Sequence, residues 1–68
     1  MLVDPTLVRA RLAVALAELA AELEIPADTV IGYWRERAGA RMLCGESEDS
    51  ALRDAYDETV RAWRRRQR

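Results

Sequence analysis

Residues Leu19–Trp34 read LAAELEIPADTVIGYW, and this stretch decides the fold. Two segments with helical character flank a break at Glu24-Ile25-Pro26, because proline interrupts a helix and biases the preceding residue toward extended geometry. The spacing of apolar and small side chains on both sides of the break predicts two short helices that share one small core. These side chains belong to Leu19, Ala20, Leu23, Ile25, Val30 and Tyr33.

A first helix is predicted upstream of the break, over residues 5–23. Asp4 suits the N-cap, and Pro5 suits the first helical position, where no backbone donor is needed. Leu7 and Val14 are expected to widen the apolar stripe of this helix. The stripe itself has steps of three or four residues and consists of Val8, Leu12, Leu16, Leu19 and Leu23.

A second helix is predicted over residues 27–38, with Gly39 as its stop signal. Two consecutive aromatic residues on a helix cannot face one direction, so either Tyr33 or Trp34 should be partly exposed. The apolar segment 42–44 is expected to fold back onto the core. Its cysteine, Cys44, is expected to be a small buried residue or an idle thiol, because no histidine is present to activate it.

A third helix is predicted over residues 47–66. Residues 46–59 contain six acidic residues and one arginine, a net charge of −5, whereas residues 60–68 contain five arginines and no acid. Acids at the start and bases at the end match the helix dipole. The sequence thus predicts a single all-α domain over residues 1–68, a small three-helix fold whose first and third helices sandwich the middle one.

Length and composition narrow the class of protein. A chain of 68 residues has room for one core and buries roughly 60% of its unfolded surface, so it benefits from a further source of stability. One cysteine and no histidine exclude an intramolecular disulfide and a Cys/His zinc site. Oligomerisation remains, so we expect a homodimer or larger assembly, without a metal or cofactor.

The sequence also predicts the cellular location and the source of the protein. It begins with Met and shows no signal-peptide pattern, and even its longest uncharged runs, such as residues 12–17, are far too short to span a bilayer. We therefore expect a complete, soluble, cytoplasmic protein with no membrane partner. All eleven basic residues are arginine, which follows GC-rich codons and indicates a bacterial or phage source.

Residues 19–34 resemble the helix-turn-helix superfamily. The small residue Ala20 and the apolar positions around the turn match its pattern, as do Thr29-Val30 and Trp34-Arg35. The resemblance implies that the second helix is presented to DNA or to a partner protein. It also implies a positive φ at Glu24, where the family usually has glycine.

The first functional hypothesis is a small DNA-binding regulatory or accessory protein. Arg35 would read guanine, while Asp28 and Ile31 would contact cytosine and a thymine methyl group. Arg35, Arg37 and Arg41 would also meet phosphates. The arginine-rich end would add charge, unless it is a solvated helix terminus or pairs with acids of another copy. It comprises Arg61, Arg64, Arg65, Arg66 and Arg68.

The second hypothesis is a non-enzymatic helical adaptor or assembly protein that binds other proteins, itself included. Ile31, Trp34 and Leu43 would supply the apolar contacts, since tryptophan is common at binding hot spots. An enzyme is not expected, because acid/base catalysis requires carboxyls with a raised pKa in a cleft, and a single small helical domain offers little cleft. The isoelectric point near 5.4 is low for a DNA-binding domain, so both hypotheses stay open.

Overall fold

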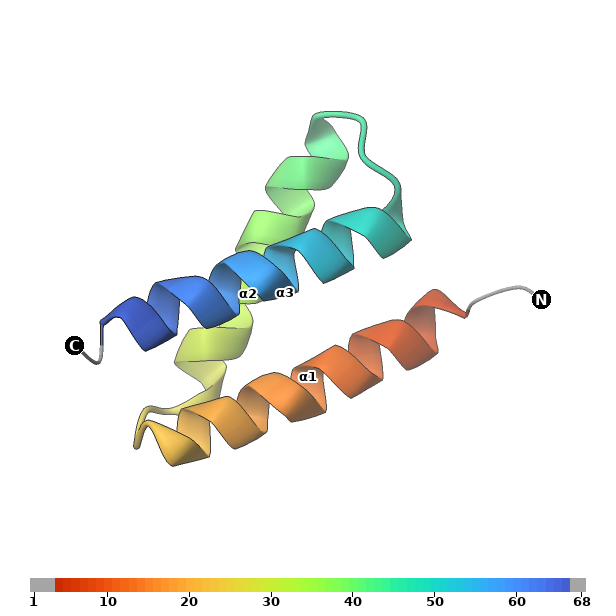
Figure 1. Ribbon diagram of the computed structural model, residues 1–68. Coiled ribbons are helices and arrows are strands. Elements are labelled where there is room, and N and C mark those ends of the chain that lie inside the picture. The colour runs from red at the N-terminus through yellow and green to blue at the C-terminus, as the bar shows by residue number, and fades with distance from the viewer. Residues whose placement is uncertain (1–3, 67–68) are drawn as a thin grey trace.

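The computed structural model describes residues 4–66, which form three α-helices and contain no strand within that range (Figure 1). Helix α1 runs over Pro5–Glu22, α2 over Ala27–Leu43 and α3 over Glu48–Arg65. The predicted all-α, three-helix fold is therefore confirmed. No helix in the described part of the chain has the length and apolar character that crossing a membrane requires.

Both ends of α1 follow from local sequence. The Asp4 side chain accepts a hydrogen bond from the Thr6 amide at 2.9 Å, and Pro5 occupies the first helical position. At the other end, Ile25 N–H donates to Ala20 O at 2.9 Å, the hydrogen bond that closes a Schellman cap. Glu24 has φ 57° in this cap, which confirms the expected positive φ.

Helix α2 is longer than the sequence predicted, and the predicted stop at Gly39 is wrong. Glycine inside a helix costs only about 1 kcal/mol relative to alanine, which the remaining turns of α2 offset. The helix ends instead at Leu43, and two residues later Gly45 has φ 96° and its N–H donates to Met42 O at 3.0 Å. Glu46 N–H donates to Arg41 O at 3.1 Å and completes a second Schellman cap.

Helix α3 matches its prediction within a residue or two at each end. Ser47 is the N-cap, and its hydroxyl accepts a hydrogen bond from the Ser50 amide at 3.3 Å. Acidic residues occupy its first turn and arginines its last, as the helix dipole favours.

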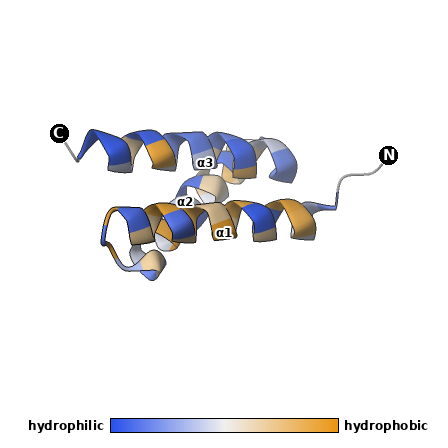
Figure 2. Ribbon diagram, turned by 60° about the horizontal axis from the view of Figure 1, so that its bottom comes forward, coloured by the Kyte–Doolittle hydropathy of each residue, from blue (hydrophilic) through white to orange (hydrophobic). Residues whose placement is uncertain are grey.

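The three helices pack pairwise around one core. Helices α1 and α3 lie side by side and run in the same direction, and α2 crosses both (Figures 1 and 2). The predicted sandwich is therefore incomplete, because α1 and α3 also pack directly against each other. Two exposed ion pairs join them at opposite ends, Arg9–Glu48 at 2.9 Å and Glu22–Arg64 at 3.7 Å.

The core confirms the predicted stripe of α1 but not its predicted width. Leu16 and Leu19 are buried, as are Val30 and Trp34 of α2. Leu7 and Val14, by contrast, are 58% and 59% exposed. They do not widen the buried stripe, because their positions on the helix are opposite to it.

Candidate functional site

The predicted contact residues at the start of α2 do not form a common outer surface. Asp28 is exposed in the first turn, whereas Ile31 is half-buried and packs against the core. Trp34 is fully buried, and its indole N–H donates to the Leu52 carbonyl oxygen at 2.9 Å. The expectation that Trp34 contacts a partner is therefore wrong. Tyr33, which is half-buried, is the partly exposed member of the aromatic pair.

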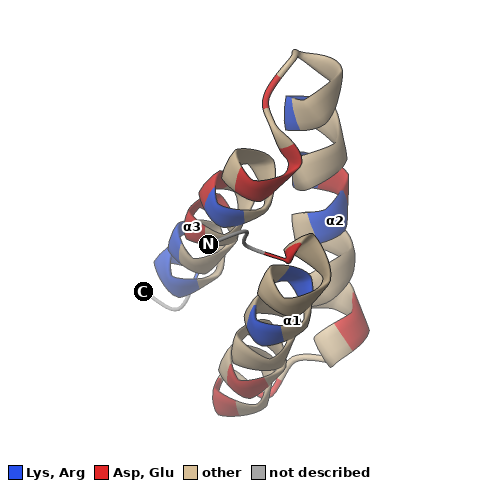
Figure 3. Cartoon of the chain, turned by 90° about the vertical axis from the view of Figure 1, so that its right-hand side faces the viewer, with Lys and Arg blue, Asp and Glu red and all other residues tan. Residues whose placement is uncertain are grey.

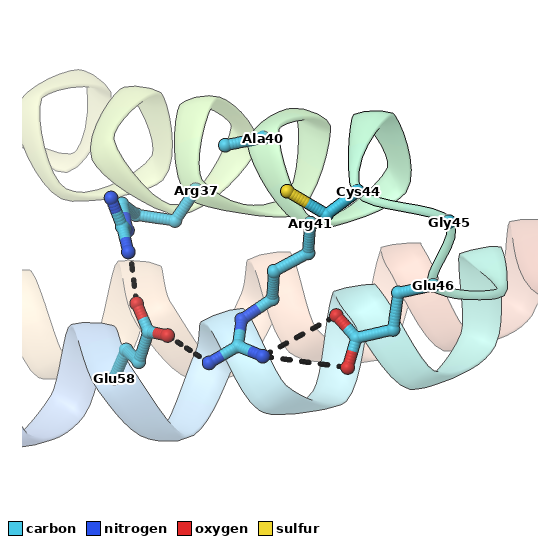
Figure 4. Close-up of a pocket in the computed structure, with 7 residues that line it drawn as sticks. All are labelled: Arg37, Ala40, Arg41, Cys44, Gly45, Glu46 and Glu58. Atoms are coloured by element: carbon cyan, nitrogen blue, oxygen red, sulfur yellow. Dashed lines mark hydrogen bonds and ion pairs between the residues drawn. The ribbon is translucent and has the colours of Figure 1, made fainter.

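Arg37 and Arg41 lie against α3, where they are engaged by acidic side chains (Figure 4). Arg37 Nε donates to Glu58 Oε2 at 2.9 Å, and Arg41 Nη2 donates to the other oxygen of the same carboxylate. Arg41 Nη1 also donates to Glu46 Oε2 at 3.3 Å and lies 3.7 Å from Asp54 Oδ2. Arg37 is exposed, as predicted, whereas Arg41 is half-buried, and the charge of both is compensated within the chain, so their contact with phosphates stays a prediction.

The ion-pair cluster changes the acidity of its members. Hydrogen bonds from Arg37 and Arg41 hold the pKa of the Glu58 carboxyl below its ordinary value of 4.5. The hydrogen bond to Glu58 likewise raises the pKa of the Arg41 guanidinium. Both shifts favour the charged forms, so the cluster stabilises the packing of α2 on α3.

The remaining predicted arginines are exposed in two separate places. Arg35 lines a pocket with Arg9 beside Met42, whereas the predicted arginines of the C-terminal end lie on the last two turns of α3 and at its C-cap (Figure 3). Within the latter group, the Arg66 guanidinium lies 4.6 Å from the centre of the Trp63 ring, a cation–π contact. The exposed members of this group are Arg61, Arg64, Arg65 and Arg66. Arg68 lies outside the described residues.

The tip of α2 differs from its prediction as well. Met42 and Leu43 are 38% and 91% exposed, and Cys44 is exposed beside them. The expected folding of residues 42–44 onto the core, and with it a buried Cys44, is therefore wrong. The reason is that α2 continues to Leu43, and its end projects beyond α3 (Figure 1).

Sequence reasoning missed the outer face of α1. This face, which we call the outer stripe, repeats at steps of three and four residues opposite the core, and apolar segments run along α1 in Figure 2. Four of its residues are exposed and Ala17 is half-buried. A signal was present, because α1 is apolar on two sides, and such helices are typically covered on both. The outer stripe comprises Leu7, Ala10, Val14, Ala17 and Ala21.

Two further features concern metal binding and the pocket at the end of α2. Within residues 4–66, no group of three or more Cys, Asp or Glu side chains is placed to hold a metal ion. The pocket beside Cys44 is lined by Arg37, Arg41, Glu46 and Glu58, the ion-pair cluster described above. Compared with known proteins, the chain matches no family model, no curated protein and no solved structure.

Proposed function

We propose that this chain is a small helical assembly protein that acts by binding protein through the outer stripe of α1. The observation that carries the proposal is the exposure of Leu7 and Val14, 58% and 59%, on a helix whose opposite side forms the core. Apolar side chains aligned on one exposed helix face mark a surface for helix-in-groove or helix–helix binding.

The acidic residues beside the stripe bear on the kind of partner. Glu18 is matched by Arg11 along the same edge, and Glu22 is paired with Arg64, so this face has no net positive charge to attract phosphate groups of DNA or of anionic lipids. Alanines at three of the five stripe positions leave room for the backbone of another helix to approach closely. An apolar helix of a protein therefore fits this face better than a nucleic acid or a membrane.

Binding through the stripe is tested with three baits, the wild-type chain and two variants of equal net charge. Val14→Glu places a carboxylate within the stripe, while Thr29→Glu places one on the exposed side of α2. Both substitutions leave the core intact. We expect wild type and Thr29→Glu to retain bound protein, whether foreign or a second tagged copy, and Val14→Glu to lose it. Equal recovery on all three baits would refute the proposal.

DNA binding remains as a second candidate, favoured by one observation. Four exposed arginines lie on the last two turns of α3 and at its C-cap, which concentrates positive charge at this end of the helix (Figure 3). Because Arg37 and Arg41 are compensated by Glu58 and Glu46, such binding would depend on α3 rather than on the helix-turn-helix segment.

The DNA candidate predicts strong salt dependence. Binding of a fluorescent random duplex at low salt should weaken steeply as salt is added, and Arg61→Glu combined with Arg65→Glu should abolish it. Arg37→Gln should leave the affinity unchanged. No binding of duplex by micromolar protein at low salt would eliminate this candidate.

A further inference from the structure

The charges of α1 divide into two groups with different surroundings. Arg9 and Glu22 form the ion pairs with α3 that join the two helices. Arg11 and Glu18 are exposed, and among the described residues neither takes part in an ion pair. They lie seven residues apart, so they occupy the same side of the helix, along one edge of the outer stripe.

The order of these charges opposes the dipole of their own helix. Arg11 lies in the N-terminal half of α1 and Glu18 in the C-terminal half, whereas the dipole favours acids first and bases last (Figure 3). For Arg9 and Glu22, the parallel helix α3 supplies the compensating charges. For Arg11 and Glu18, an antiparallel helix with the same charge order would supply them.

We infer that the outer stripe is the self-association surface, on which α1 of a second copy packs antiparallel. This inference rests on the proposed function and names its partner. A two-fold axis between Val14 and Ala17 sets Arg11 of each copy beside Glu18 of the other, so one pair of residues forms two ion pairs. Val14 of each copy then packs over Ala17 of the other, and Ala10 lies opposite Ala21.

Alternative arrangements of two α1 helices lack this complementarity. A parallel pair in register sets like charges level with one another, Arg11 with Arg11 and Glu18 with Glu18. An antiparallel pair shifted by one heptad brings Arg11 close to Arg11 of the other copy. Flanking charges of this kind set orientation and register in helix pairs, so they select the antiparallel arrangement centred between Val14 and Ala17.

The size of the stripe sets the expected affinity. From Leu7 to Ala21 it extends about 21 Å along the helix, and it is about 10 Å wide. This footprint is smaller than the roughly 800 Å² per partner of a standard interface. We therefore expect a weak, reversible dimer.

Charge reversal tests the inference on the purified full chain by sedimentation equilibrium. Arg11→Glu and Glu18→Arg each turn two attractive pairs into two repulsive ones, so each variant alone should dimerise about tenfold more weakly than wild type. An equimolar mixture of the two variants should recover the wild-type affinity, because opposite charges face each other again. Arg35→Glu, an exposed change on α2, is the matched control and should have no effect.

Cysteine cross-linking tests the orientation in a Cys44→Ser background. Ala10→Cys and Ala21→Cys chains should form a mixed disulfide when combined. Neither should cross-link to itself, since identical positions lie about 16 Å apart in the antiparallel pair and a disulfide joins Cα atoms about 4–7 Å apart. Self-linked products in place of mixed ones would overturn the antiparallel arrangement.

Other outcomes also overturn the inference, and they separate it from the proposed function. A wild-type chain that remains monomeric to submillimolar concentration excludes the second copy. If that monomer still binds a foreign protein through Val14, the proposed function stands alone. A dimer that is insensitive to Val14→Glu and to both charge reversals uses another surface.

Discussion

The indole N–H of Trp34 donates a hydrogen bond to the Leu52 carbonyl oxygen at 2.9 Å, across the interface between α2 and α3. Trp34 is the largest of the fully buried side chains, so this bond fixes the register of two helices at the centre of the core. The same packing of α2 on α3 places Arg37 and Arg41 against Glu58.

Replacing Trp34 is expected to have the largest effect on stability. Trp34→Ala should cost about 3–5 kcal/mol, which is comparable to the whole stability of a domain this small and would leave it largely unfolded. Trp34→Phe retains most of the apolar contact and should cost about 2 kcal/mol. Urea titration followed by circular dichroism measures both, with the exposed Arg35→Ala as the control. Equal stability of Trp34→Phe and wild type would contradict a role for the hydrogen bond.

The ion-pair cluster around Glu58 makes stability depend on pH. The pKa of Glu58 lies below 4.5 in the folded chain, so its ionised form stabilises the fold. This contribution is complete above about pH 4.5 and is lost as the pH falls through the lower folded pKa. Glu58→Gln should therefore lower the free energy of unfolding by up to about 1 kcal/mol at neutral pH, and by less in acid.

The control for this prediction is Asp57→Asn, which removes an exposed carboxylate with no ion pair among the described residues. Its free energy of unfolding should differ from that of wild type by less than about 0.5 kcal/mol at neutral pH. A Glu58→Gln deficit that does not shrink on acidification would show that the cluster does not act through the charge of Glu58.

Two helix ends have a residue with positive φ, so introducing glycine at one and removing it at the other should change stability in opposite directions. Glu24, at φ 57°, adopts the left-handed conformation that disfavours a residue with a Cβ, so Glu24→Gly should raise stability by about 0.5–1 kcal/mol. Gly45, at φ 96°, should lose about 1 kcal/mol on change to alanine. Thermal melts of the two variants should move in opposite directions from wild type, and shifts of the same sign would contradict the two caps.

The glycine within α2 offers a stabilising substitution. A Cβ added at Gly39 meets no heavy atom within 4 Å, so alanine fits there without strain. Gly39→Ala should therefore raise the free energy of unfolding by about 0.5–1 kcal/mol through helix propensity alone. Chemical denaturation measures it. A loss of stability would mean that the end of α2 needs the freedom that glycine provides.

Several features of the fold could be predicted from the amino-acid sequence, because they depend on residues that are neighbours in sequence. The cap at Asp4, the turn at Glu24 and the stripe through Leu16 involve residues within one or two turns of each other. The stop predicted at Gly39 failed for a related reason. Glycine is a weak signal by itself, and contacts of Arg41 with α3 stabilise the turn that follows it.

The candidate site was less predictable, because side-chain partners come from distant positions. Nothing near Arg37 or Arg41 in sequence indicates that Glu58 engages both of them. The outer stripe, by contrast, was recoverable from its heptad spacing. It was overlooked because Leu7 and Val14 were assigned to the core side of the helix.

The amino-acid sequence by itself determined that this protein is three helices with two defined turns, since hydrophobic periodicity, caps and backbone conformational preferences act locally. Only the tertiary structure decided which surfaces remain for a partner. Packing of α2 across α1 and α3 buried Trp34, placed Arg37 and Arg41 against acids and left the outer stripe of α1 exposed. Burial and charge compensation are properties of the assembled helices, because they depend on which faces meet.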